Sequence, residues 1–181
     1  MKRKNEKPTM KKIVISSIIL IMALVAVIIA PTTRAGVPAP AGALALVGAW
    51  NAQVTLTPCV GSPPPFKARH IFNVDGTLAS TDNQPGMNPS GIRNGPAFGT
   101  WQYMGGRQFA AYFEFYFFNP DGTWAGYAKI NLTITLAADG NSFHGDIKSQ
   151  RFDTNGNMIG KGTGSENDTR QEPENLDVRC N

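Results

Sequence analysis

The chain has 181 residues and a formal net charge of +4 at pH 7, with 17 Lys and Arg residues against 13 Asp and Glu residues. Seven of the basic residues but only one acid, Glu6, fall within residues 1–35, so the remainder carries 10 basic and 12 acidic residues and a net charge of −2. The remainder therefore lacks the positive surface that neutralises nucleic-acid phosphates, and we expect no nucleic-acid partner. Its length suits one domain with its own core.

The first 35 residues are typical of a secretory signal peptide. A lysine-rich start precedes an apolar stretch at residues 13–30, and small residues at Thr33 and Ala35 suit a signal peptidase that cuts after Ala35. A cut after Ala45 is an alternative. So is an uncleaved membrane anchor, because this stretch of 18 residues approaches the length of a membrane span. We expect an exported protein, secreted or periplasmic, that contacts a membrane only if this segment is uncleaved.

Two short segments flank the expected domain. Residues 36–46, rich in Pro, Ala and Gly, are expected to be a linker, and residues 171–181 a polar tail. The two cysteines, Cys59 and Cys180, can form a disulfide outside the cytoplasm, and the bridge would tie the tail to the first strand. Two unpaired thiols are the alternative.

Residues 47–170 alternate between apolar and polar side chains with the period of a β-strand. Turn sequences such as Asp75-Gly76-Thr77 and Asn155-Gly156-Asn157 separate the alternating segments, and their positions between strands indicate turns and not calcium loops. The expected strands are residues 48–56, 66–74, 78–81, 98–104, 107–119, 124–136, 142–152 and 158–170. With no helix to cover one face, this predicts an all-β fold, an eight-stranded antiparallel up-and-down (meander) barrel.

Gly48-Ala49-Trp50 on the first strand resembles the Gly-x-Trp signature of the lipocalin-like, calycin-type barrels. In those families the Trp closes one end of the barrel and an Arg near the last strand packs across its ring. The resemblance implies a calycin-like barrel with structural roles for Trp50 and Arg170.

The interior of an eight-stranded barrel is either filled by side chains or holds one small ligand. Alternation points an aromatic-rich set of side chains inward, and these are the expected ligand-binding residues: Phe66, His70, Phe72, Phe109, Phe113, Phe115, Phe117 and Trp124. His70 is a candidate for proton transfer to a ligand or a core histidine. Glu114 is a catalytic candidate only if a bulge turns it inward; otherwise it is a surface carboxylate. Arg107 and Arg151 are expected near strand ends, where an Arg can meet a ligand carboxylate or simply rim the opening.

No catalytic motif and no cluster with metal-ligand spacing occurs in the sequence, so we expect no metal and no cofactor. The favoured function is binding of a small apolar molecule inside the barrel. The alternative is a cavity enzyme that resembles allene oxide cyclase or the barrel-shaped cycloaddition catalysts, a cyclase or isomerase that works mainly by positioning its substrate. A structural or interaction module with a filled core is the third possibility.

Overall fold

Residues 42–58, 64–83 and 91–174 are described by the computed structural model, and they belong to the unit formed by residues 39–181. The predicted signal peptide and the predicted disulfide partners Cys59 and Cys180 lie outside the described residues. Within the described part of the chain, no helix is long and apolar enough to cross a lipid bilayer.

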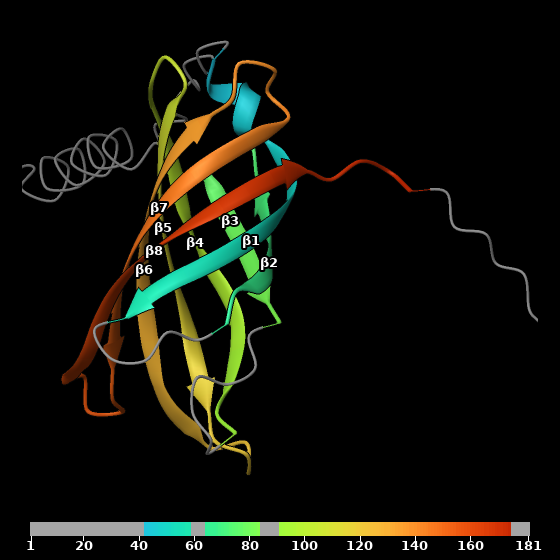
Figure 1. Ribbon diagram of the computed structural model, residues 1–181. Coiled ribbons are helices and arrows are strands. Elements are labelled where there is room, and N and C mark those ends of the chain that lie inside the picture. The colour runs from blue at the N-terminus through green and yellow to red at the C-terminus, as the bar shows by residue number, and fades with distance from the viewer. Residues whose placement is uncertain (1–41, 59–63, 84–90, 175–181) are drawn as a thin grey trace, which may run out of the picture. The chain divides into compact units, whose positions relative to one another are not determined.

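In these described ranges, eight antiparallel strands close into a barrel, each paired with its neighbours in the chain and the last paired with the first (Figure 1). The strands are β1 (Gly48–Pro58), β2 (Phe66–Phe72), β3 (Thr77–Asp82), β4 (Arg93–Gly105), β5 (Gln108–Phe118), β6 (Trp124–Leu136), β7 (Ser142–Phe152) and β8 (Met158–Arg170). The predicted all-β, eight-stranded up-and-down barrel is confirmed. Closure of the barrel pairs the two edge strands of the meander, β1 and β8, with each other.

Two turns at opposite ends of the barrel are stabilised by the same pattern of hydrogen bonds to an aspartate side chain. Asp75 accepts hydrogen bonds from the backbone N–H and the hydroxyl of Thr77 at 2.9 and 2.7 Å. Asp121 accepts the same two bonds from Thr123 at 2.9 and 2.7 Å. Hydrogen bonds to the charged carboxylate lower the pKa of both aspartates. The Asp-Gly-Thr sequences are therefore turns, as their positions between strands indicated.

Two differences from the expected elements exceed two residues. β4 begins at Arg93, inside a segment that the sequence suggested was a loop. Its register against β5 shifts between Asn94 and Ala97, where Gly95 and Pro96 interrupt the alternation. Residues Ala43–Leu46, assigned to the linker, form the short 3-10 helix η1.

One end of the barrel is closed by η1 and the side chains beneath it. Leu46 and Trp50 are fully buried, and the indole N–H of Trp50 donates a hydrogen bond to the carbonyl of Leu46 at 2.9 Å. The guanidinium of Arg170 lies over the indole ring, 4.3 Å from its centroid. It also donates hydrogen bonds of 2.6–3.2 Å to the carbonyls of Ala45, Val47 and Gly140. This is the arrangement that the resemblance to calycin-type barrels implies.

The glycine of the Gly-x-Trp sequence has a physical role at this closed end. Gly48 has a φ of 133°, and a Cβ there would lie 2.8 Å from Nη1 of Arg170. A side chain at this position would be both strained and in the path of the guanidinium.

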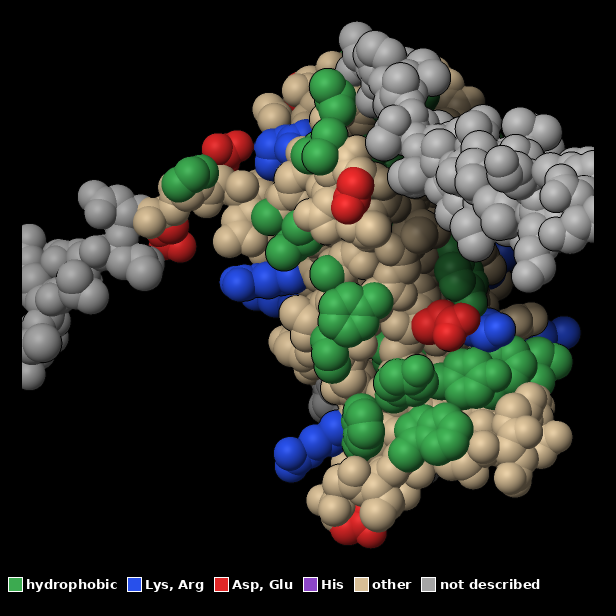
Figure 2. Space-filling model, turned by 180° about the vertical axis from the view of Figure 1, so that it is seen from behind, with side chains coloured by type: hydrophobic (Ala, Val, Ile, Leu, Met, Phe, Trp, Pro, Cys, Tyr) green, Lys and Arg blue, Asp and Glu red, His purple; other side chains and the backbone are tan. Residues whose placement is uncertain are grey.

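Hydrophobic side chains also gather on the outside of the barrel (Figure 2). The rings of Tyr127 and Phe152 stack with centroids 4.8 Å apart, and Tyr116 meets Trp124 edge to face at 6.3 Å. Trp124 is 46% exposed and Tyr116 55% exposed. Because an exposed aromatic patch can bind apolar molecules without specificity, tests of interior binding need a control for it.

Candidate functional site

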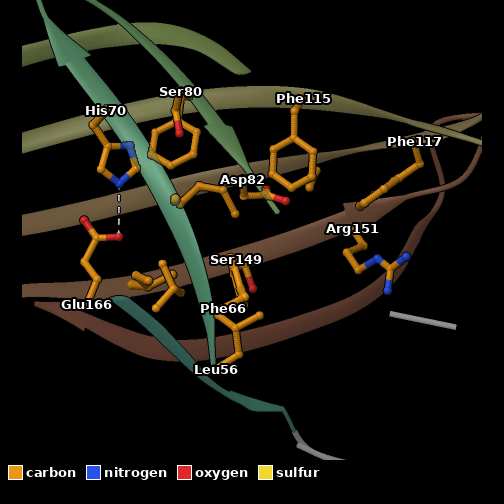
Figure 3. A pocket seen from close by; sticks show the side chains of 16 residues that line it. Leu56, Phe66, His70, Ser80, Asp82, Phe115, Phe117, Ser149, Arg151 and Glu166 are labelled. Carbon is orange, nitrogen blue, oxygen red and sulfur yellow. Dashed lines mark ion pairs between the residues drawn. The ribbon is translucent and has the colours of Figure 1, made fainter. Parts of the chain in front are cut away.

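A largely apolar cavity lies inside the barrel, and Trp50 is not among the residues that line it. Figure 3 shows the lining side chains. It encloses about 80 Å³ and is partly open to solvent. Its aromatic lining residues are Phe66, Phe113, Phe115 and Phe117. Its aliphatic lining residues are Val54, Leu56, Ile130 and Ile147, and the strand register places Val54 beside Phe66 and Ile130 beside Phe113. Alternation along β1, β2, β5, β6 and β7 aims these side chains inward.

His70 and Glu166 form the inner end of the cavity, and Asp168 lies behind them. His70 Nε2 is 3.4 Å from a carboxylate oxygen of Glu166 and 3.9 Å from one of Asp168. The three residues are 2%, 2% and 1% exposed. A buried cluster of one imidazole and two carboxyl groups is costly to fold, so it marks this end of the cavity as a candidate functional site.

The last strand supplies the two acids by simple alternation. Glu166 pairs with Gly145 of β7, and Asp168 pairs with Ala52 of β1. Gly145 makes room for the acid, since a Cβ there would lie 2.8 Å from Cγ and 3.2 Å from Oε1 of Glu166. Because residue 145 is a glycine, the backbone of β7 leaves space beside it for the side chain of Glu166.

Burial dominates the electrostatics of this cluster. It disfavours the charged carboxylate, and together with the neighbouring charge of Glu166 it raises the pKa of Asp168 to about 9. Both oxygens of Asp168, Oε1 of Glu166 and both ring nitrogens of His70 lack a hydrogen-bond partner among the described residues. Within those residues the carboxylates have ion pairs only with His70.

Arg151 lies at the other end of the cavity, beside Phe117 (Figure 3). Its guanidinium sits over the Phe117 ring, 4.5 Å from the centroid. Partial burial lowers its pKa, and its buried Nε has no hydrogen-bond partner in the described ranges. The cavity therefore has a largely apolar lining, with His70 and Glu166 at its inner end and Arg151 at the other end. Ser80, Asp82 and Ser149 are its other polar lining residues.

The structure sorts the expected ligand-binding residues into three groups. Lining the cavity are Phe66, His70, Phe113, Phe115 and Phe117. Phe72 and Phe109 are buried, at 1% exposure each, but they belong to the closed end, where Phe72 meets Trp101 and Phe143. Trp124 forms the third group.

Trp124 does not line the interior, contrary to the prediction. A register shift between Phe117 and Phe118 pairs Trp124 with Phe118, and Ala125 packs toward the core in its place. This irregularity breaks the alternation at the start of β6, so Trp124 faces outward.

Glu114 lies on the outer face of β5. This is the second of the two expected alternatives, in which Glu114 is a surface carboxylate. It accepts a hydrogen bond from the hydroxyl of Tyr112 and lies 3.7 Å from Nζ of Lys129. Burial and this acid raise the pKa of Tyr112 to about 12. No bulge turns Glu114 inward, since the register is continuous from Gln108 to Phe117. The inward orientation on which its role as a catalytic candidate depended is therefore not adopted.

The sequence pattern did not reveal Glu166 and Asp168, because both faces of β8 are polar or glycine after Ile159, which removes the contrast that shows orientation. A signal was nonetheless present. Arg170 was expected to pack inward across Trp50, and a period of two from Arg170 places Asp168 and Glu166 on the same inward face.

The assembled site can hold an apolar molecule along its walls and can contact a polar group at either end. The chain was compared with protein-family models, with curated proteins and with solved structures. No family model, no curated protein and no solved structure matches it.

Proposed function

We propose that this protein is an exported, lipocalin-like barrel that binds a small, slender apolar molecule in its interior. The observation that carries the proposal is the partly open cavity whose lining surface is largely apolar. Pockets for small molecules have this composition, a largely apolar lining with a few convergent polar groups. The stacking of Arg170 on Trp50 supports the lipocalin-like part of the proposal.

The size of the cavity restricts the ligand. Its volume of about 80 Å³ is about half the roughly 150 Å³ of an apolar cavity that takes up benzene. A slender molecule fits with its inner part between the phenylalanines and its outer part toward the mouth. A broad ring system requires these side chains to move, which well-packed interiors resist.

Arg151 at the mouth favours a ligand with an acidic outer end. A guanidinium binds a carboxylate through two parallel hydrogen bonds, and its Nε is without a partner among the described side chains. We therefore infer a preference for a slender apolar carboxylic acid over the corresponding neutral molecule.

A short, slender diene carboxylic acid, sorbic acid, titrated by calorimetry, tests both parts of this proposal. We expect saturable binding to the wild type, and at least about tenfold weaker binding by Phe115→Trp, because the larger ring fills the cavity. Arg151→Gln should weaken binding of the acid but not of its methyl ester, because only the acid carries a charge.

Two variants are the controls for this titration. Arg69→Gln removes an exposed charge from β2, and Trp124→Ala removes a ring from the outer aromatic patch. Neither should change the affinity. Absence of saturable binding, or unchanged affinity in Phe115→Trp, would contradict the proposal. Melting temperatures of all variants separate loss of binding from loss of folding.

The cavity enzyme is the second candidate, and one observation favours it. The polar side chains of His70 and Glu166 meet the apolar cavity at its inner end, where they would contact a reactive molecule held in position by the phenylalanines. Binding without turnover supports the carrier; conversion of a bound polyene or epoxide supports the enzyme.

A further inference from the structure

We propose that His70, Glu166 and Asp168 form a binding site for one divalent transition-metal cation, of the Zn²⁺ type, at the inner end of the barrel cavity. The inference does not rest on the proposed function, because a cation can bind here whether or not an apolar ligand fills the cavity. It also revises an expectation from the sequence, which showed no cluster at metal-ligand spacing.

The three side chains are brought together by barrel closure and not by sequence spacing. His70 comes from β2 and the two acids from β8, and both strands flank β1. One potential ligand atom from each residue lies within 4.8 Å of the other two. Zinc lies about 2.0–2.2 Å from imidazole and carboxylate ligands, so tetrahedral ligand atoms are about 3.4 Å apart. The distances of 3.4 and 3.9 Å from His70 Nε2 are close to this spacing.

The ligand atoms are buried and unpartnered, which is the second, independent observation. His70 is 2% exposed, and neither of its ring nitrogens has a hydrogen-bond partner in the described part of the chain. Buried polar atoms of this kind ordinarily have hydrogen-bond partners. Buried polar atoms without one therefore point to a ligand that supplies the partner. One cation between the three side chains would supply a partner to Nε2 and to both carboxylates at once.

The charges of the buried side chains also favour a bound cation. Two carboxylates face each other in an apolar interior, and among the described residues no Lys or Arg pairs with either of them. Such a pair must be neutralised by protons or by a cation. A divalent cation balances two carboxylates and leaves the imidazole neutral, the form in which it binds metal.

The surroundings suit a site with an open coordination position. The rings of Phe72 and Phe113 lie 6.1 and 6.0 Å from the His70 ring and provide an apolar shell. His70 and Glu166 line the cavity, whereas Asp168 does not. A bound cation would therefore have protein ligands on one side and the cavity on the other. Nitrogen and oxygen ligands in this mixture select zinc and its neighbours over calcium or magnesium.

Zinc alone, added to protein stripped with a chelator, tests the site. Cys59→Ser and Cys180→Ser are introduced throughout, so that thiols cannot hold zinc. We expect one zinc per chain by elemental analysis and titration calorimetry, and a melting temperature raised by at least about 5 °C in excess zinc. His70→Gln and Asp168→Asn should each weaken zinc binding at least about tenfold.

A matched control is available on the outer surface, where His144 Nε2 lies 3.6 Å from Asp146 in an exposed pair. His144→Gln should leave zinc affinity unchanged. Cobalt provides a readout that does not depend on variant folding, because Co²⁺ bound to the wild type should give visible d–d absorption. Sub-stoichiometric zinc with no cobalt spectrum would overturn the proposal, as would zinc lost in His144→Gln and retained in Asp168→Asn. Binding of the apolar ligand is measured in a separate titration. Failure of the zinc site can therefore be distinguished from failure of the proposed ligand-binding function.

Discussion

Trp50→Ala is expected to lower the free energy of unfolding by about 3–5 kcal/mol, the range for truncation of a buried large aromatic side chain. Trp50 is fully buried, its ring centroid lies 4.9 Å from that of Phe143, and its N–H is bonded to Leu46. Truncation leaves a cavity at the closed end and removes the surface on which Arg170 stacks. Urea denaturation followed by circular dichroism measures the change.

Trp124→Ala provides the same chemical change at an exposed position. Trp124 is 46% exposed and contacts Tyr116 on the outer face, so we expect a loss below about 1.5 kcal/mol. Equal losses in the two variants would contradict the role assigned to Trp50 at the closed end.

The stability of the metal-free protein is expected to fall as the pH rises from 5 to 8. Burial and the neighbouring Glu166 raise the pKa of Asp168 from its ordinary value of 3.8 to about 9 in the folded state. The folded state then holds a proton that the unfolded state has released. The stabilisation is therefore fully present below pH 3.8 and is lost progressively up to pH 9.

Between pH 5 and pH 8, the free energy of unfolding should decrease by at least about 1.4 kcal/mol, which is the equivalent of one pKa unit. Measurement in a chelator avoids competition by metal, and Asp168→Asn should flatten the profile because the amide does not titrate. His70 and Glu166 also face Asp168, so the variant isolates the contribution of one acid.

Exposed aspartates should not disturb the measurement. Asp75, Asp121 and Asp153 have lowered pKa values, so they remain ionised between pH 5 and 8. Glu114→Gln, on the outer face, is the matched control and should leave the slope unchanged. A stability that rises over this interval in the wild type would show that Asp168 is not protonated in the folded state.

The architecture was predictable because local and global signals agree along most of the chain. Phe113, Phe115 and Phe117 alternate with polar residues, and turns such as that at Asp121 bring the chain back antiparallel. His70 was placed inward by the same rule, and it is buried at 2% exposure. Alternation is reliable on strands where one face is apolar and the other polar.

The errors arose where that contrast fails or the period slips. β8 carries no large apolar side chain after Ile159, so alternation could not show that Glu166 and Asp168 face inward. At Trp124 a register shift reversed the expected face. The cluster of His70 with two acids depends on closure of β8 against β1, a contact between strands far apart in the sequence.

The central claim is that the barrel interior, and not the outer aromatic patch, binds a small apolar molecule. Isoleucine methyl NMR tests it directly, because Ile130 and Ile147 line the cavity whereas Ile71 and Ile159 are 49% and 60% exposed on the outside. On titration with sorbic acid, we expect saturable shifts at Ile130 and Ile147 and none at Ile71 or Ile159. Shifts confined to the exposed methyl groups, or no shift at all, would contradict it.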